Sequence, residues 1–129
     1  MFDSIWYQSL IKPPLSPPNW VFAPVWVGLY LLIFLSLAIY ILKIDEDKEM
    51  GYMYFIIQMA LNLIWSPVFF ASRNILAALI LIILLDIFVL LTIWKFFSVS
   101  KWSGILLIPY LVWILFATYL NFGYLILNR

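Results

Sequence analysis

The amino-acid sequence predicts an all-α membrane protein, built as a bundle of transmembrane helices. Hydrophobic residues make up 67% of the chain and charged residues only 10%, whereas soluble domains are about 45–50% apolar and about 25% charged. A chain of 129 residues is also too short to hide so much apolar surface in a water-soluble fold. In a lipid bilayer, exposed apolar surface carries no such penalty, so we expect an integral, multi-pass membrane protein.

Four apolar segments are long enough to cross a bilayer as helices, which takes about 20 residues. They run from about 20 to 42, 50 to 72, 75 to 94 and 102 to 127. The segments are too long for transmembrane strands, and their hydrophobicity does not alternate. Only Arg73 and Asn74 separate the second segment from the third, which predicts an antiparallel hairpin. We therefore expect one domain, residues 1–129, with four visible spans.

The N-terminal segment, residues 1–19, differs in kind from the rest of the chain. It contains four of the seven prolines, at positions 13, 14, 17 and 18. Proline fixes its own φ angle and biases the preceding residue towards extended conformations. The composition predicts a stiff, largely non-helical lid that lies against the membrane surface.

The residues that are missing from the sequence exclude several kinds of chemistry. The chain contains neither cysteine nor histidine, so zinc sites built on those residues, a His-ligated haem and a histidine base are excluded. We expect no metal site and no obligatory cofactor. A net charge of +1 gives no electrostatic footprint for nucleic acid. The sequence also has no phosphate-binding glycine loop and no nucleophile paired with a base, which disfavours an enzyme.

Polar and aromatic residues gather on single faces of the predicted helices, at helical spacing. On the second span these are Gln58, Asn62, Trp65, Ser66 and Phe69, and on the fourth Tyr110, Trp113, Ala117, Leu120 and Tyr124. Trp26 and Tyr30 are one turn apart on the first span. Two interpretations stay open. The side chains either pack the core and form hydrogen bonds between helices, or they line a cavity for a ligand.

Asp86 is the one charged residue inside the third span. An acid within a membrane segment is a candidate functional residue. The alternative is a structural acid that faces the bundle, since no basic residue lies inside any span to pair with it. In a transporter or channel subunit, Asp86 and the prolines of the spans would open a path for the substrate.

Three segments of the chain resemble the signatures of the tryptophan-rich sensory protein (TspO) or translocator protein family, also called TspO/MBR. They are Trp6-Tyr7 with Lys12–Trp26, then Ala60–Phe70, then Pro109–Asn121. The signatures occur in the family's order and cover essentially the whole chain. Family members usually have five spans, with one helix before the first signature. That helix is expected to be absent here, either because the member is short or because Met1 is not the original start.

The resemblance implies a sensory or translocator protein whose aromatic pocket binds porphyrins such as protoporphyrin IX and is closed by the proline-rich segment. Carried over to matching positions, the ligand-binding residues would be Trp26, Tyr30, Asn62, Trp65, Ser66, Trp113, Ala117 and Leu120. It further implies that the partners are the porphyrin, membrane lipid and a second copy of the chain in a homodimer.

Further roles are implied by the same resemblance. If the protein degrades porphyrin in light, Trp6 and Trp113 would take part. The family's sterol motif maps onto Leu120, Tyr124 and Arg129, although such motifs are weak patterns. The alternatives to porphyrin binding are therefore a small-molecule transporter or channel subunit and light-dependent porphyrin degradation.

Overall fold

The computed structural model describes residues 6, 9–11, 19–43, 48–71 and 74–128, and every regular element among them is helical. The elements are α2 (Asn19–Leu42), α3 (Glu49–Ser66), the π-helix η1 (Pro67–Ala71), α4 (Ile75–Val99), α5 (Lys101–Ile105) and α6 (Ile108–Leu127). Four stretches are long and apolar enough to cross a bilayer, namely Trp20–Leu42, Glu49–Phe70, Ile75–Val99 and Lys101–Leu127. The predicted fold class, an all-α bundle with four spans, is confirmed.

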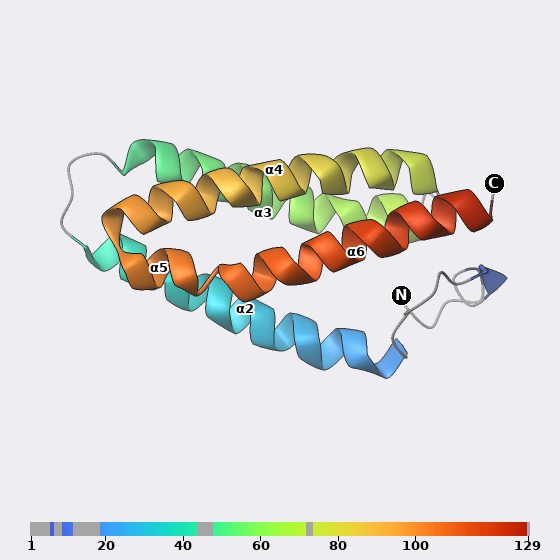
Figure 1. Ribbon diagram of the computed structural model, residues 1–129, viewed down its shortest axis with the longest axis horizontal. Helices are drawn as coiled ribbons and strands as arrows, with labels where there is room; N and C mark the ends of the chain where they lie inside the picture. Colours follow the sequence, from blue (N-terminus) through green and yellow to red (C-terminus); the bar gives the residue numbers. More distant parts are fainter. Residues whose placement is uncertain (1–5, 7–8, 12–18, 44–47, 72–73, 129) are drawn as a thin grey trace.

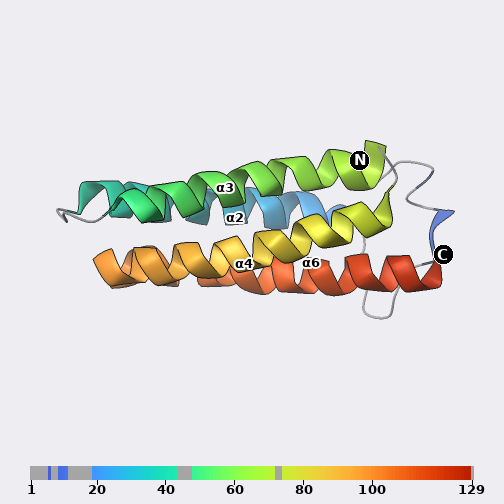
Figure 2. The same cartoon turned by 90° about the horizontal axis from the view of Figure 1, so that it is seen from above.

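The long helices lie side by side in two layers, with α2 and α3 in one and α4 and α6 in the other (Figure 2). Helix α4 packs against α3, α5 and α6, and α2 packs against α5 and α6. We call the end of the bundle where α2 finishes and α3 begins the loop end. The opposite end, where α2 begins and α6 finishes, is the cavity end (Figure 1).

The observed helix boundaries differ from the predicted ones in two places. The third helix continues to Val99 instead of ending near residue 94, because Phe96 is fully buried in the core. The fourth span divides into α5 and α6 just before Pro109, which occupies the first turn of α6. Proline has no backbone N–H, so it is tolerated at the start of a helix and not in its interior.

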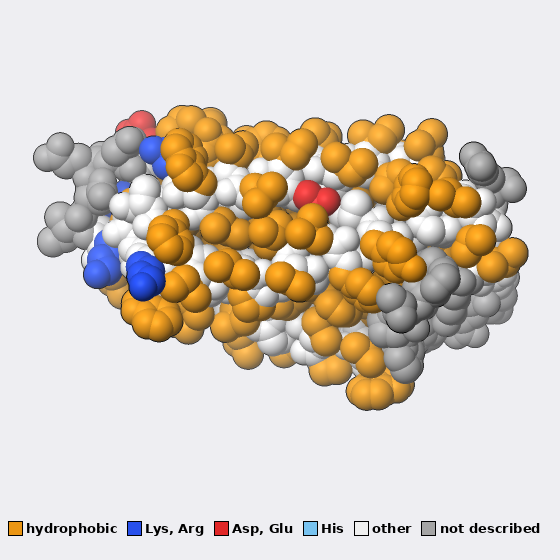
Figure 3. Space-filling view, viewed as in Figure 1, with side chains coloured by type: hydrophobic (Ala, Val, Ile, Leu, Met, Phe, Trp, Pro, Cys, Tyr) orange, Lys and Arg blue, Asp and Glu red, His pale blue; other side chains and the backbone are white. Residues whose placement is uncertain are grey.

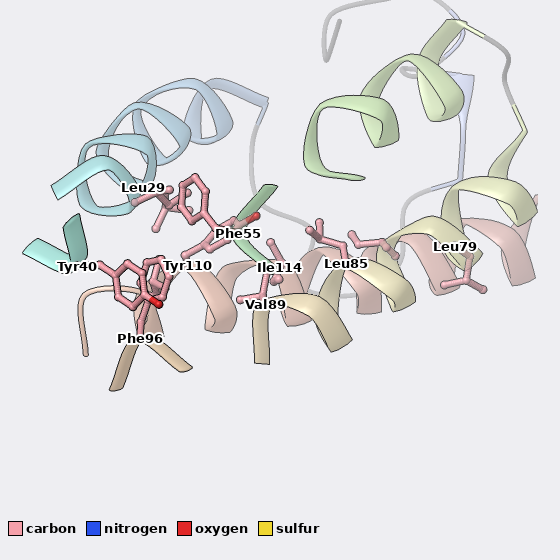
Figure 4. Close-up of a cluster of buried hydrophobic side chains, with 12 residues drawn as sticks. Leu29, Tyr40, Phe55, Leu79, Leu85, Val89, Phe96, Tyr110 and Ile114 are labelled. Carbon is pink, nitrogen blue, oxygen red and sulfur yellow. The ribbon is translucent and has the colours of Figure 1, made fainter. Parts of the chain in front are cut away.

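The loop end is packed by stacked aromatic rings. The ring of Phe96 lies parallel to those of Tyr40, at 4.0 Å between centroids, and Phe55, at 5.8 Å; all three belong to the buried cluster drawn in Figure 4. The Tyr40 hydroxyl donates to the Lys48 carbonyl at 2.8 Å. Gly51 lies so close to this tyrosine that a Cβ atom would collide with its ring and hydroxyl. These contacts join α2, α3 and α4 at the loop end.

Two serines fasten α2 to α5 at the same end. Ser36 Oγ donates to the Ser103 carbonyl at 2.5 Å, and Ser103 Oγ donates to the Ser36 carbonyl at 2.8 Å. Both side chains are fully buried. Because small hydroxyl residues allow helix backbones to approach closely within a membrane, this reciprocal pair holds the two helices in contact.

The outer surface suits a lipid environment. Hydrophobic side chains cover the long face of the bundle, and basic side chains gather at one end of it (Figure 3). Trp20, Trp94 and Trp102 are highly exposed near helix ends, as expected for tryptophans at the membrane–water interface. Trp6 differs, because it is only partly exposed and packs edge-on against Phe69 at 5.6 Å.

Candidate functional site

A cavity of about 250 Å³ lies among α2, α3, α4 and α6, towards the cavity end of the bundle. Its lining is formed by Ala23, Trp26 and Tyr30 of α2, Asn62, Trp65 and Ser66 of α3, Ile82 and Leu85 of α4, and Ile114 and Ala117 of α6. Successive aromatic rings pack along its α2 wall. The ring centroids of Trp26 and Tyr30 are 5.6 Å apart, and those of Tyr30 and Phe34 are 6.3 Å apart. The cavity is therefore mostly apolar and aromatic, with few polar groups.

The polar side of the cavity is built from a chain of hydrogen bonds. The Tyr30 hydroxyl donates to Asn62 Oδ1 at 2.5 Å, and Asn62 Nδ2 donates to the Tyr110 hydroxyl at 2.7 Å. That hydroxyl in turn donates to Gln58 Oε1 at 2.8 Å. The chain joins α2, α3 and α6 and fixes which way each amide points. Asn62 thus forms hydrogen bonds between helices, as one interpretation predicted, and it also lines the cavity.

A second, smaller cavity of about 30 Å³ adjoins the first, with room for about one water molecule. The two share Trp26, Trp65 and Ala117 as lining residues. The rest of its wall consists of Phe22, Phe69, Phe70, Trp113, Leu120, Asn121 and Tyr124. The two spaces thus share part of their walls.

Trp65 is held in this wall by both polar and aromatic contacts. Its Nε1 donates to Asn121 Oδ1 at 2.9 Å, while Asn121 Nδ2 donates to the Ile75 carbonyl at 3.1 Å. The chain then widens into the π-helix that starts at Pro67. The wider turn places the next two aromatic rings against Trp65, Phe69 at 5.3 Å and Phe70 at 6.0 Å. Such π-helical turns are frequent at functional sites.

The N-terminal segment reaches the cavity end of the bundle. Ile11 exchanges two hydrogen bonds with the side chain of Asn128, one from its N–H at 2.8 Å and one to its carbonyl at 3.0 Å. Trp6 lies against Phe69 of the smaller cavity's wall. The prolines of the predicted lid lie outside the described residues.

Two buried N–H groups near the cavities lack a hydrogen-bond partner among the described residues. They are Trp113 Nε1 and Gln58 Nε2. Gln58 is 1% exposed, and Trp113 lines the smaller cavity, where it packs edge-on against Phe22 at 5.8 Å. An unpaired donor in a dry interior is costly. Of the two, Trp113 lies in a cavity wall, where a ligand's acceptor atom could reach it, whereas Gln58 lines neither cavity.

The remaining predicted residues lie elsewhere. Asp86 is not part of either cavity lining and contacts Thr118 of α6. Of the predicted sterol motif, Leu120 and Tyr124 are buried inside the bundle, and Arg129 lies outside the described residues. Within the described part of the chain, no group of three or more His, Cys, Asp or Glu side chains could hold a metal ion.

The structure brings together the residues predicted to bind a ligand. Trp26, Tyr30, Asn62, Trp65, Ser66 and Ala117 line the larger cavity, and Trp113 and Leu120 line the smaller one. Sequence reasoning missed Ala23, Ile82, Leu85 and Ile114 in the larger cavity and Phe22, Phe70 and Asn121 in the smaller one. Helical spacing could have found Ala23 and Ile114, which lie three residues before Trp26 and Ala117. Ile82 lies one helical turn before Asp86, so it would have followed from the interpretation of Asp86 as an acid that faces the bundle, whereas no such signal marks Leu85.

Comparison with known proteins agrees with this geometry. The model of the TspO/MBR family matches residues 1–127. The chain belongs to the TspO/MBR family. The tryptophan-rich protein TspO of Chlorobaculum tepidum is 44% identical over 131 residues, covering 97% of this chain and 80% of the relative. The protein of the same name from Archaeoglobus fulgidus is 46% identical, and the match covers 95% of this chain and 80% of the relative. The human translocator protein is 34% identical, covering 91% of this TspO/MBR chain and 71% of its own length.

Proposed function

We propose that this TspO/MBR protein binds a porphyrin, such as protoporphyrin IX, in the larger cavity while embedded in a membrane through its four long helices. The observation that carries the proposal is the cavity wall, in which Trp26, Tyr30 and Trp65 present aromatic surfaces and Asn62 supplies an amide. A flat, apolar, aromatic macrocycle suits such a wall, because ring faces stack on ring faces with few polar groups to desolvate.

The cavity is small for a porphyrin, so binding would require side chains in its wall to move. Its volume of about 250 Å³ lies just below the range of roughly 300–1,000 Å³ of small-molecule pockets. Trp26 and Trp65 belong to the walls of both cavities, so a rotation of either side chain would enlarge the space open to the ligand. We therefore expect the tryptophans to move when the porphyrin binds.

The donor in the cavity wall gives the ligand an orientation. The Trp113 Nε1–H is buried and has no partner in the part of the chain that the structure describes, and a carboxylate or carbonyl oxygen at the edge of the ligand would accept from it. Protoporphyrin IX carries two carboxylate side chains on one edge of its ring. A metal-free porphyrin needs no axial ligand, so the absence of His and Cys from the sequence is compatible with this ligand.

A titration of the protein in lipid nanodiscs with protoporphyrin IX tests the proposal, with quenching of tryptophan fluorescence as the readout. The double variant Trp26→Ala, Trp113→Ala should bind at least about tenfold more weakly, a loss of about 1.4 kcal/mol. The matched control is Trp94→Ala, Trp102→Ala, which removes two exposed tryptophans outside the cavity. Equal affinities of the two double variants would exclude this site.

A further inference from the structure

We propose that Asp86 holds a proton, and that its neutral carboxyl group forms a proton-binding site with Thr118 in the seam between α4 and α6. This site is separate from the cavity and does not depend on the identity of the ligand. Asp86 is the twelfth residue of the 25-residue helix α4, close to its middle, and only 8% of it is exposed. Figure 3 shows acidic atoms midway along an otherwise apolar face of the bundle.

No cation lies at the depth of Asp86 in the described helices. Lys95 is nine residues further along α4, which places it about 13 Å away at 1.5 Å per residue. The other titratable residues on the helices that pack against α4 are Glu49, Tyr52 and Tyr54 of α3, Lys101 of α5, and Tyr110, Tyr119 and Tyr124 of α6. Glu49 and Lys101 lie at the loop end. The Tyr110 hydroxyl is bonded to Asn62 and Gln58.

The hydrogen bonds of Thr118 indicate which atom holds the proton. Its Oγ1 lies 2.7 Å from Asp86 Oδ2 and 2.8 Å from the Ile114 carbonyl oxygen. A hydroxyl has one hydrogen to donate, and an ionised carboxylate and a carbonyl both only accept. If Asp86 Oδ2 carries a proton, it donates to Thr118, and Thr118 donates to Ile114. Every hydrogen is then used once, and both short contacts are satisfied.

The second carboxyl oxygen supports the same assignment. Asp86 Oδ1 is buried and has no hydrogen-bond partner among the described residues. In an ionised carboxylate this oxygen would carry half of a buried charge with no donor to stabilise it, which is far more costly than a bare neutral carbonyl. The lack of a cation, the single hydroxyl hydrogen and the unpaired oxygen all favour the neutral acid.

The residues that precede this pair in the chain face the cavity, although the pair itself does not. Leu85 and Ala117, which line the cavity, directly precede Asp86 and Thr118 in the chain, and Ile114 lines it as well. Loss of the proton would draw the Thr118 hydrogen from Ile114 to Asp86 and place a charge directly behind this wall.

Infrared spectroscopy of the protein in lipid nanodiscs at neutral pH tests the assignment directly. The chain has four aspartates, at positions 3, 45, 47 and 86, so the carboxyl carbon of aspartate can be labelled with ¹³C in the unmodified protein. We expect one labelled carboxylic-acid C=O band beside the carboxylate bands of the others. This band should be missing from Asp86→Asn, whose amide can still donate to Thr118.

Two variants of the partner sharpen the test. Thr118→Val keeps the shape of the side chain and removes the hydroxyl, so the acid band should stay but move to higher frequency. In Thr118→Ser the hydroxyl returns, and the band should return to its wild-type position. A labelled wild-type protein that has only carboxylate bands would overturn the proposal, and so would an acid band that persists in Asp86→Asn.

Discussion

The two ends of the bundle are built from the same kinds of residue but serve different purposes. At the loop end, Phe96 and Tyr40 stack at 4.0 Å, and the Ser36–Ser103 pair joins α2 to α5. At the cavity end, α2 diverges from α6 (Figure 1), and Trp26 and Trp65 line an open space. Aromatic side chains thus fill one end and surround a cavity at the other.

The difference arises from the neighbours of the aromatic residues. At the loop end, small residues such as Gly51 let the rings approach the backbone of the next helix. At the cavity end, Pro67 and the π-helix widen α3, and the hydrogen bonds of Asn62 to Tyr30 and Tyr110 fix the polar side chains beside the cavity. We infer that the loop end stabilises the fold and the cavity end adapts to a ligand.

Removal of a ring from the loop end should have the largest effect on stability. Phe96→Ala should lower the free energy of unfolding by about 3 kcal/mol. This is the low end of the values measured in soluble proteins, because in a membrane the removed ring gains no hydrophobic transfer energy relative to lipid. Thermal unfolding in detergent, followed by circular dichroism, measures the loss. Phe97→Ala is the matched control, because Phe97 is 47% exposed and should cost much less. Equal losses would contradict the comparison.

A smaller loss is expected where the loop end is too tight for a methyl group. Gly51→Ala should cost about 2 kcal/mol through overpacking, since the new Cβ would meet the Tyr40 ring. Gly28→Ala serves as the control, because no atom outside its own helix backbone lies within 4 Å of a Cβ built there. We expect its melting temperature to equal or exceed that of the wild type. If Gly51→Ala melts at the wild-type temperature, the packing at this end is looser than described.

At the cavity end, loss of a single hydrogen bond should matter least. Tyr30→Phe removes the hydroxyl that donates to Asn62 and keeps the ring that stacks on Phe34. Such bonds between membrane helices are worth about 0.6 kcal/mol, so the melting temperature should change only slightly. A loss as large as that of Phe96→Ala would mean that the cavity end also supports the fold.

The sequence predicts the fold class well because composition and span length depend on no tertiary contact. The helix boundaries near Trp94 and Pro109 could not be predicted in the same way. The position of Phe96 in the core and the break before α6 depend on how the helices pack. The aromatic face of the second span predicts its cavity residues through helical spacing. The contribution of α4 was not predicted, because the sequence left open whether Asp86 faces the bundle, and the apolar residues around it do not by themselves mark Ile82 and Leu85 as the inner face.

The same reasoning explains why Asp86 stayed ambiguous in the sequence. Its lack of a basic partner is visible in the sequence, because no Lys or Arg lies inside a span. Its partner Thr118 lies 32 residues away on another helix, and only the packing of α4 against α6 brings the two together. The sequence thus identifies the unusual residue, and the tertiary structure identifies its environment.

The most direct test of the account is the porphyrin affinity of a variant with a filled cavity. Ala117 lines both cavities, so Ala117→Phe should occupy the space that the ligand needs. We predict that protoporphyrin IX binds this variant at least about tenfold more weakly, while the melting temperature stays close to that of the wild type. Ala60→Phe, on the exposed side of α3, should bind normally. Wild-type affinity in a folded Ala117→Phe variant would contradict the assignment of this cavity as the ligand site.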